Sequence, residues 1–210
     1  MRLTKYGHSC VRIERDGTVL VIDPGAFTEP VALDGVDAVL ITHEHFDHLN
    51  VDALADALAK RPSVTVHTHP DVLPKLTALA GAVSTVESGQ SFSAAGFAVR
   101  AYGGLHAEIH RDLPRVANLG FLIEETVYHP GDSFDVPAGA DVQTLFVPIS
   151  APWLKLSESV EFVRAVAPRR AFALHDCLLS DAGFMVTDKN MATLSGCDYA
   201  RLGAGESVQS

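Results

Sequence analysis

Ile41-Thr42-His43-Glu44-His45-Phe46-Asp47-His48-Leu49 places three histidines and an aspartate within six consecutive residues. The apolar run at residues 37–41 has the character of a buried strand, and residues 51–58 have helical apolar spacing. The cluster is therefore expected on a loop between a strand and a helix. Imidazole nitrogen and carboxylate oxygen are ligands that zinc and similar divalent ions accept. The stretch predicts a metal site.

One loop of this composition can begin two adjacent metal sites. His43 and His45 occupy alternate positions and can point one way, while Asp47 and His48 point another. The competing interpretation is a run of exposed histidines on a surface loop. The density of the four side chains, and their place directly after a buried strand, favour the metal site.

The His-x-His-x-Asp-His pattern at residues 43–48 resembles the metallo-β-lactamase superfamily of metal-dependent hydrolases. Three other segments resemble its small single-domain branch, which includes ascorbate-6-phosphate lactonase and relatives of N-acylphosphatidylethanolamine phospholipase D. They are Gly7-His8-Ser9-Cys10, Val21-Ile22-Asp23-Pro24-Gly25 and His129-Pro130-Gly131-Asp132-Ser133. The resemblance covers almost the whole chain. It implies an α/β fold, an αββα sandwich of two mixed β-sheets flanked by helices, in a single domain over residues 1–210.

A site for two metals needs more ligands than one loop supplies, and three later residues follow predicted strands. His106 comes after residues 97–102, Asp132 after 127–129 and His175 after 172–174. The resemblance implies that the first metal is bound by His43, His45 and His106, that the second is bound by Asp47, His48 and His175, and that Asp132 bridges them. His110 is a rival of His106, Asp132 has an alternative role as an Asx-turn former, and Asp176 and Cys177 are rival ligands beside His175.

Paired divalent ions would make hydroxide available at neutral pH, because one bound ion lowers the pKa of water from ~15.7 to about 7. Zinc is the first expectation, with manganese and iron as alternatives. Three residues are candidates for catalytic roles. Asp47 would orient the hydroxide, His8 would contact the substrate or a ligand, and His110 would hydrogen-bond a leaving group together with Arg111. The plainer alternatives are a solvated turn for His8 and a mobile polar loop for His110.

Composition narrows the class of protein. The chain has 210 residues, 47% of them hydrophobic, and a formal net charge of −10. This charge disfavours nucleic acid and anionic membranes as partners, and no apolar run reaches the roughly 20 residues that span a bilayer. Three cysteines and the lack of a signal-like segment favour the cytoplasm. A small-molecule substrate is expected, and a homo-oligomer is compatible with the sequence.

The leading hypothesis is a metal-dependent hydrolase acting on an ester, a lactone or a phosphorylated small molecule. The alternatives are a phosphodiesterase or nuclease, which the acidic charge disfavours, and a non-catalytic metal-binding module, which the intact ligand set disfavours. The apolar patterns predict strands at residues 2–6, 10–14, 19–23, 38–42, 64–67, 97–102, 119–123, 126–129, 143–147 and 170–174. They predict helices from residue 51, over 72–80 and over 157–166, the last with Ser157 as N-cap.

Overall fold

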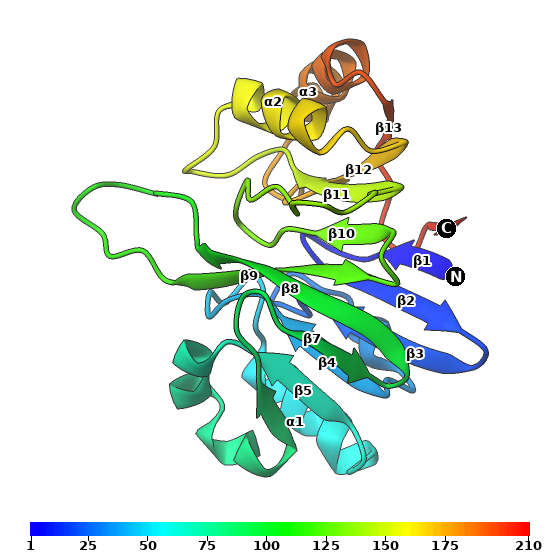
Figure 1. The fold of residues 1–210 in the computed structure, drawn as a ribbon, viewed down its shortest axis with the longest axis vertical. Coiled ribbons are helices and arrows are strands. Elements are labelled where there is room, and N and C mark those ends of the chain that lie inside the picture. Colours follow the sequence, from blue (N-terminus) through cyan, green and yellow to red (C-terminus); the bar gives the residue numbers. More distant parts are fainter.

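The computed structural model describes residues 1–210, and its strands form two seven-stranded sheets (Figure 1). The first sheet has the order β14 (Ser207–Gln209), β1 (Arg2–Lys5), β2 (Val11–Arg15), β3 (Thr18–Ile22), β4 (Ala38–Ile41), β5 (Thr65–Thr68) and β6 (Val83–Thr85). The second has the order β13 (Asp198–Ala200), β12 (Arg170–Leu174), β11 (Thr144–Pro148), β10 (Val127–His129), β9 (Ala117–Ile123), β8 (Phe97–Leu105) and β7 (Ser91–Ala94). Both contain parallel and antiparallel pairs, so the predicted mixed sheets are confirmed.

Helices cover the outer face of each sheet. Helix α1 (Val51–Lys60) packs on the first sheet, whereas α2 (Leu156–Val166) and α3 (Asp181–Leu194) pack on the second (Figure 1). Three short 3₁₀ helices complete the layers: η1 (Pro30–Leu33), η2 (Pro70–Lys75) and η3 (Thr77–Ala82). The predicted αββα sandwich is confirmed. None of the helices combines the length and the apolar composition that crossing a membrane requires.

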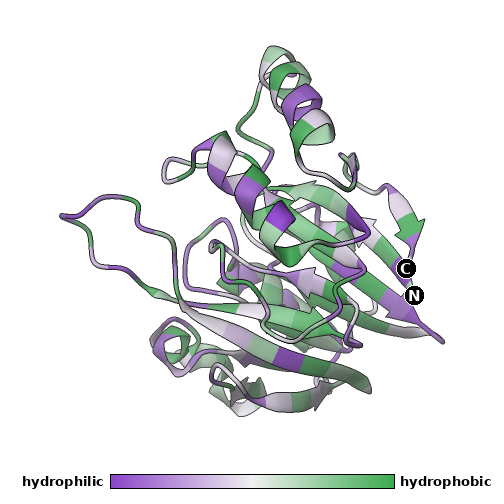
Figure 2. Ribbon diagram, turned by 45° about the horizontal axis from the view of Figure 1, so that its top comes forward, coloured by the Kyte–Doolittle hydropathy of each residue, from purple (hydrophilic) through white to green (hydrophobic).

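Strand β3 shows how alternating side chains hold these layers together. Leu20 and Ile22 belong to the apolar cluster between the two sheets, while Val19 and Val21 belong to the cluster under α1. Successive side chains of a strand point to opposite faces, so a strand covered on both faces is apolar throughout. Figure 2 shows the hydrophobic residues concentrated along the strands, whereas the loop that joins β8 and β9 is largely hydrophilic.

Helix α1 begins directly after the predicted metal loop and fixes its far end. The Asn50 side chain caps the helix by accepting a hydrogen bond from the backbone N–H of Ala53 at 3.1 Å. Leu54 and Ala57 are buried against the sheet. The loop at residues 42–50 is therefore held between a buried strand and a capped, packed helix.

The segment after β5 differs from its prediction. Instead of one helix over residues 72–80, two 3₁₀ helices follow each other and meet at Leu76. Pro74 lies inside the first of them and has no backbone N–H to continue an α-helical ladder. The apolar spacing was compatible with a helix, but the proline breaks the segment into short turns.

Two features of the C-terminal third also differ from expectation. Helix α2 starts at Leu156 with Lys155 as N-cap, because the Glu158 carboxylate accepts a hydrogen bond from the Lys155 backbone N–H at 2.7 Å. The N-cap prediction for Ser157 was wrong. Helix α3 was not predicted at all: only Thr187 and Met191 are buried in it, so its sequence lacks a clear apolar stripe.

Candidate metal centre

The seven predicted ligands come together at one edge of the two sheets, each just beyond the end of a strand. The loop after β4 carries His43, His45, Asp47 and His48; His106 follows β8, Asp132 follows β10 and His175 follows β12. Because β4 is parallel to its neighbours β3 and β5, and β10 is parallel to β11, the ends of these strands lie at common edges. The sheet topology therefore brings residues that are far apart in the sequence into one cluster.

Three histidines form the first group. The ring centroids of His43, His45 and His106 lie 4.7 to 4.9 Å from one another, and each offers a nitrogen within 4.8 Å of the other two. His43 Nε2 and His45 Nδ1 are 3.1 Å apart. Three imidazoles around one point match the donor set of a three-histidine zinc site.

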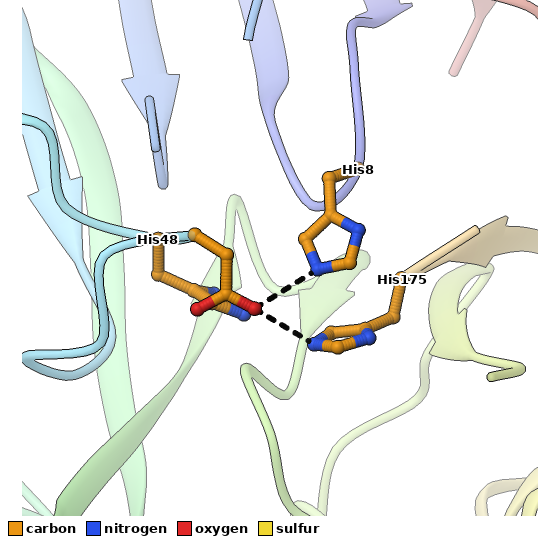
Figure 3. A group of neighbouring side chains, drawn as sticks. His8, His48 and His175 are labelled. Carbon is orange, nitrogen blue, oxygen red and sulfur yellow. Dashed lines mark hydrogen bonds and ion pairs between the residues drawn. The ribbon is translucent and has the colours of Figure 1, made fainter. Parts of the chain in front are cut away.

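The second group contains Asp47, His48 and His175, and it also includes His8. Figure 3 shows the rings of His8 and His175 directed at one carboxylate, with a dashed line to each, and the His48 side chain beside them. Asp47 Oδ2 lies 3.1 Å from His8 Nε2 and 3.4 Å from His175 Nε2. The His8 and His175 ring centroids are 3.8 Å apart. Four side chains could therefore contribute ligand atoms here.

Asp132 lies between the two groups. Its Oδ1 is 3.1 Å from His48 Nε2, and its Oδ2 is 3.2 Å from His106 Nε2 and 3.1 Å from His175 Nε2. Asp132 Oδ1 and the Nε2 atoms of His106 and His175 are buried, yet they lack a hydrogen-bond partner of good geometry. Buried polar atoms are costly without a partner. Divalent cations bound among them would satisfy all three atoms, so the residues fit a pair of metal ions.

The second ring nitrogen of four histidines is already in use. His43 Nδ1 faces Thr42 Oγ1 at 2.9 Å, His48 Nδ1 faces Asp23 Oδ2 at 2.7 Å, His106 Nδ1 faces the Ala107 carbonyl at 2.5 Å, and His175 Nδ1 faces the Ser150 carbonyl at 2.7 Å. Each Nδ1 that donates its proton to such an oxygen leaves Nε2 with a free lone pair directed into the cluster. This pattern of outer hydrogen bonds is characteristic of histidines that bind metals.

The charges of the cluster support a bound cation. Burial lowers the pKa of His43 well below its usual range. Burial alone would also lower the pKa of His48, but the carboxylates of Asp132 and Asp23 raise it well above that range. The same competition, with Asp132 as the main opposing partner, raises the pKa of His175 to about 9. Without a metal, protons on these histidines balance the carboxylates; divalent ions would take over that role.

Three residues of the site have backbone conformations that are uncommon for residues other than glycine. His8, Asp23 and His175 have φ angles of 60°, 51° and 59°. Such conformations persist where the surroundings impose them, and they concentrate at functional sites. The His175 N–H donates to the His8 carbonyl at 3.1 Å, which ties the two loops together. The buried pair Lys5–Asp176, at 3.1 Å, holds the residue after His175.

Two glycines allow the loops to approach this closely. A Cβ atom on Gly25 would overlap the backbone carbonyl of Asp47. The segment after β3 can therefore pack this closely on the metal loop only because residue 25 is glycine. Gly131 has a φ of 62°, and a Cβ there would collide with the side chains of Asn118 and Thr42. Both glycines therefore set the position of a carboxylate, Asp47 in one case and Asp132 in the other.

His110 is not brought into the cluster. Its side chain is 59% exposed on the loop between β8 and β9, and its Nδ1 accepts a hydrogen bond from the Asp112 backbone N–H. His8, in contrast, is fully buried rather than solvated at a turn. Of the two additional histidines proposed for catalysis, the geometry favours His8 alone.

Trp153 and Cys177 also contact the cluster, although neither belongs to the seven predicted ligands and Cys177 was considered only as a rival ligand beside His175. Trp153 Nε1 donates to Asp132 Oδ2 at 3.2 Å, and Cys177 Sγ lies 3.0 Å from His8 Nδ1. Trp153 follows β11 and Cys177 follows β12, so a position beyond a strand end was the available signal. That signal is shared by many loop residues and could not distinguish these two.

Asp23 is expected to govern metal affinity although it is not in the ligand set. Its Oδ1 accepts from the Thr42 N–H at 2.8 Å, and its Oδ2 faces Thr42 Oγ1 and His48 Nδ1, both at 2.7 Å. In Asp23→Asn, an amide N–H₂ would replace an acceptor and face these donors. We expect a loss of about 10- to 100-fold in zinc affinity, measured by competition with a chromogenic chelator. Unchanged affinity would show that Asp23 does not orient His48.

A model of the β-lactamase superfamily domain matches residues 2–175. The chain belongs to this superfamily. It is 38% identical to protein Rv0786c of Mycobacterium tuberculosis over 86% of each chain. It is 30% identical to a UPF0173 metal-dependent hydrolase of Chelativorans over 63% of each. Among solved structures, the metallo-β-lactamase fold protein YhfI from Bacillus subtilis has a TM-score of 0.78 at 14% identity, covering 100% of this chain and 98% of that one. The superfamily recognised from residues 43–48 is confirmed, as is its fold.

Proposed function

We propose that this superfamily member is a hydrolase that depends on two divalent metal ions, bound by His43, His45 and His106 on one side and by Asp47, His48 and His175 on the other, with Asp132 between them. The observation that carries the proposal is the position of the Asp132 carboxylate, within 3.2 Å of histidine nitrogens from both groups. The similarity to a relative described as a metal-dependent hydrolase supports it.

Divalent ions bound there would supply a water of lowered pKa and would polarise the oxygen of an ester, lactone or phosphoryl group. The chain's own residues provide the orientation. Asp47 is held by His8 at 3.1 Å, and Trp153 donates to Asp132 at 3.2 Å. These contacts fix both carboxylates before a substrate arrives, which is the preorganisation that efficient catalysis requires.

The donor set consists of imidazole nitrogens and carboxylate oxygens, with no thiolate in the proposed set. This composition suits zinc first, and manganese and iron as alternatives, because selectivity among these ions depends on geometry and availability. A cytoplasmic location and a small-molecule substrate remain predictions from the sequence.

Metal analysis combined with diffraction tests the proposal. After loading with zinc and desalting, we expect two ions per chain, about 3.5 to 4 Å apart in anomalous difference maps. A panel of lactones, carboxylic esters, thioesters and phosphodiesters should contain substrates whose hydrolysis requires the metal. A single ion, ligands outside the seven residues, or turnover that survives metal removal would contradict the proposal.

Replacing Cys177 separates this mechanism from one that uses a thiol nucleophile. Cys177 Sγ, His8 and Asp47 form a chain of contacts of 3.0 and 3.1 Å that resembles a nucleophile, a base and a carboxylate. However, burial raises the pKa of the Cys177 thiol, which favours its unreactive protonated form. We expect Cys177→Ala to keep kcat/KM within about threefold, or less than 1 kcal/mol of transition-state stabilisation. Complete loss of turnover with both metals still bound would favour the thiol.

A further inference from the structure

Two phenylalanines border the metal centre on the side of Asp47. Phe46 lies in the metal loop between His45 and Asp47, and it is 65% exposed to solvent although its side chain is large and apolar. Phe27 is 40% exposed and packs edge-on against Phe46, with ring centroids 5.6 Å apart and an interplanar angle of 73°. We call this pair the aromatic shelf.

The aromatic shelf is fixed to the metal centre. The Ala26 N–H donates to the Phe46 carbonyl at 2.8 Å, which joins the two segments that carry the rings. The Phe27 ring also packs edge-on against His8, at 5.3 Å, and His8 in turn contacts Asp47 (Figure 3). The shelf is therefore a rigid surface continuous with the site, unlike isolated exposed side chains, which are common on protein surfaces.

Apolar side chains also border the site near the first group of histidines. The Trp153 ring lies 5.6 Å from His106, and a small cleft beside His45 and His106 is lined in part by Ile109 and Leu113. A substrate whose scissile carbonyl reaches the metal centre would meet aromatic and aliphatic carbon next to it.

No cationic side chain packs on the rings of the aromatic shelf, since the cation–π contacts of the protein involve other aromatic residues. Asp47 and Asp132 have ion-pair contacts only with histidines, and Lys5 is buried against Asp176. Arg115 keeps its charge, but it lines the small cleft beside the first group of histidines, where its Nε donates to the His106 carbonyl at 2.6 Å. The aromatic shelf itself offers no positive charge to a phosphate or carboxylate group.

We propose that the substrate is an uncharged carboxylic ester or lactone whose alkyl or aryl group packs on Phe46 and Phe27. This inference rests on the proposed hydrolase function and narrows it. In the reaction, water forms the new carbon–oxygen bond at the carbonyl, the ester carbon–oxygen bond breaks, and a proton from the water passes to the leaving alkoxide. The products are a carboxylic acid and an alcohol from an ester, or a single hydroxy acid from a lactone. Binding would remove the exposed faces of both phenylalanines from water, which favours apolar groups over charged ones.

Hydroxamates test this assignment independently of turnover, because they bind metal centres without being hydrolysed. We expect the zinc-loaded protein to bind octanohydroxamate at least about 10-fold more tightly than acetohydroxamate in calorimetry. Phe46→Ala should reduce this ratio to below about threefold, and Phe46→Leu should restore part of it. Val31→Ala is the matched control, since Val31 is 51% exposed in η1 and should leave the ratio unchanged.

The possible failures are distinguishable. Equal affinity for the two hydroxamates, or a ratio that Phe46→Ala leaves intact, overturns the assignment of the aromatic shelf. Faster hydrolysis of bis(p-nitrophenyl) phosphate than of p-nitrophenyl octanoate also overturns it, while leaving a metal-dependent hydrolase in place. A protein that takes up no zinc and binds neither hydroxamate overturns the proposed function itself.

Discussion

Asp132→Ala is expected to lower kcat/KM by about 1,000-fold, equivalent to roughly 4 kcal/mol of transition-state stabilisation. Both carboxylate oxygens of Asp132 face histidine nitrogens, one toward His48 and the other toward His106 and His175. Alanine would remove the only carboxylate that contacts both groups of histidines. The metal content should fall from two ions toward one or none, measured by elemental analysis of the desalted protein.

Asp112→Ala provides the matched control for this variant. Asp112 has a side chain 76% exposed on the loop between β8 and β9, where its carboxylate pairs with Arg111 and lies near His110. Surface pairs of this kind contribute little to stability, so activity and metal content should stay close to those of the unmodified protein. If Asp132→Ala retained two ions and activity within tenfold of normal, Asp132 would not be the bridge between the metals.

Most strands could be predicted because burial on two faces leaves a strong apolar signal. The segments that became β3, β4 and β12 contain short apolar runs that are followed by a polar residue, Asp23, Thr42 and His175 respectively. Helices were harder. Pro74 interrupted an apolar pattern that fitted a helix, and α3 carries so few buried residues that its sequence gives no stripe. Local apolar patterns reflect burial. They do not predict an element correctly where few of its residues are buried, as in α3, or where a proline constrains the backbone, as at Pro74.

The residues of the site also differ in how well the sequence predicts them. The density of histidines and carboxylates in residues 43–48 predicts this loop as part of the site. A position at the end of a predicted strand favoured His106, Asp132 and His175, and the structure brings all three to the same cluster. Their role as metal ligands remains a prediction. The burial of His8 was not predictable, since it depends on residues 39 and 167 positions away along the chain, Asp47 and His175. Contacts between the two sheets decide it, and no local pattern encodes them.

Chelation is expected to lower the melting temperature by about 8 to 16 °C. The seven proposed ligands come from the loops after four strands, one in the first sheet and three in the second. Metal ions bound by these ligands would cross-link the loops. Binding of a single metal to the native state stabilises it by RT ln(1 + [L]/Kd), about 4 kcal/mol when free metal is 1,000 times Kd, and the expected shift counts this one contribution. For a chain of this size, each kcal/mol corresponds to about 2 to 4 °C.

The physical basis is the electrostatics of the cluster once the metals are gone. Protons on the histidines then balance the carboxylates only in part, because Asp132 Oδ1 and the Nε2 atoms of His106 and His175 stay buried without partners of good geometry. Buried groups in this state destabilise the folded protein relative to the unfolded chain, where water solvates them. The loss should therefore be recovered when zinc is added back to the chelated protein.

Melting curves recorded with zinc, with chelator, and after zinc add-back provide the measurement, and elemental analysis must confirm each state. Asp132→Ala is the internal control: with the contact between the two groups removed, chelator should shift its melting temperature by much less. If the unmodified protein melts at the same temperature with and without its metals, the ions do not connect the loops after β4, β8, β10 and β12. The cluster at the sheet edge would then hold together through its hydrogen bonds and the Lys5–Asp176 pair alone.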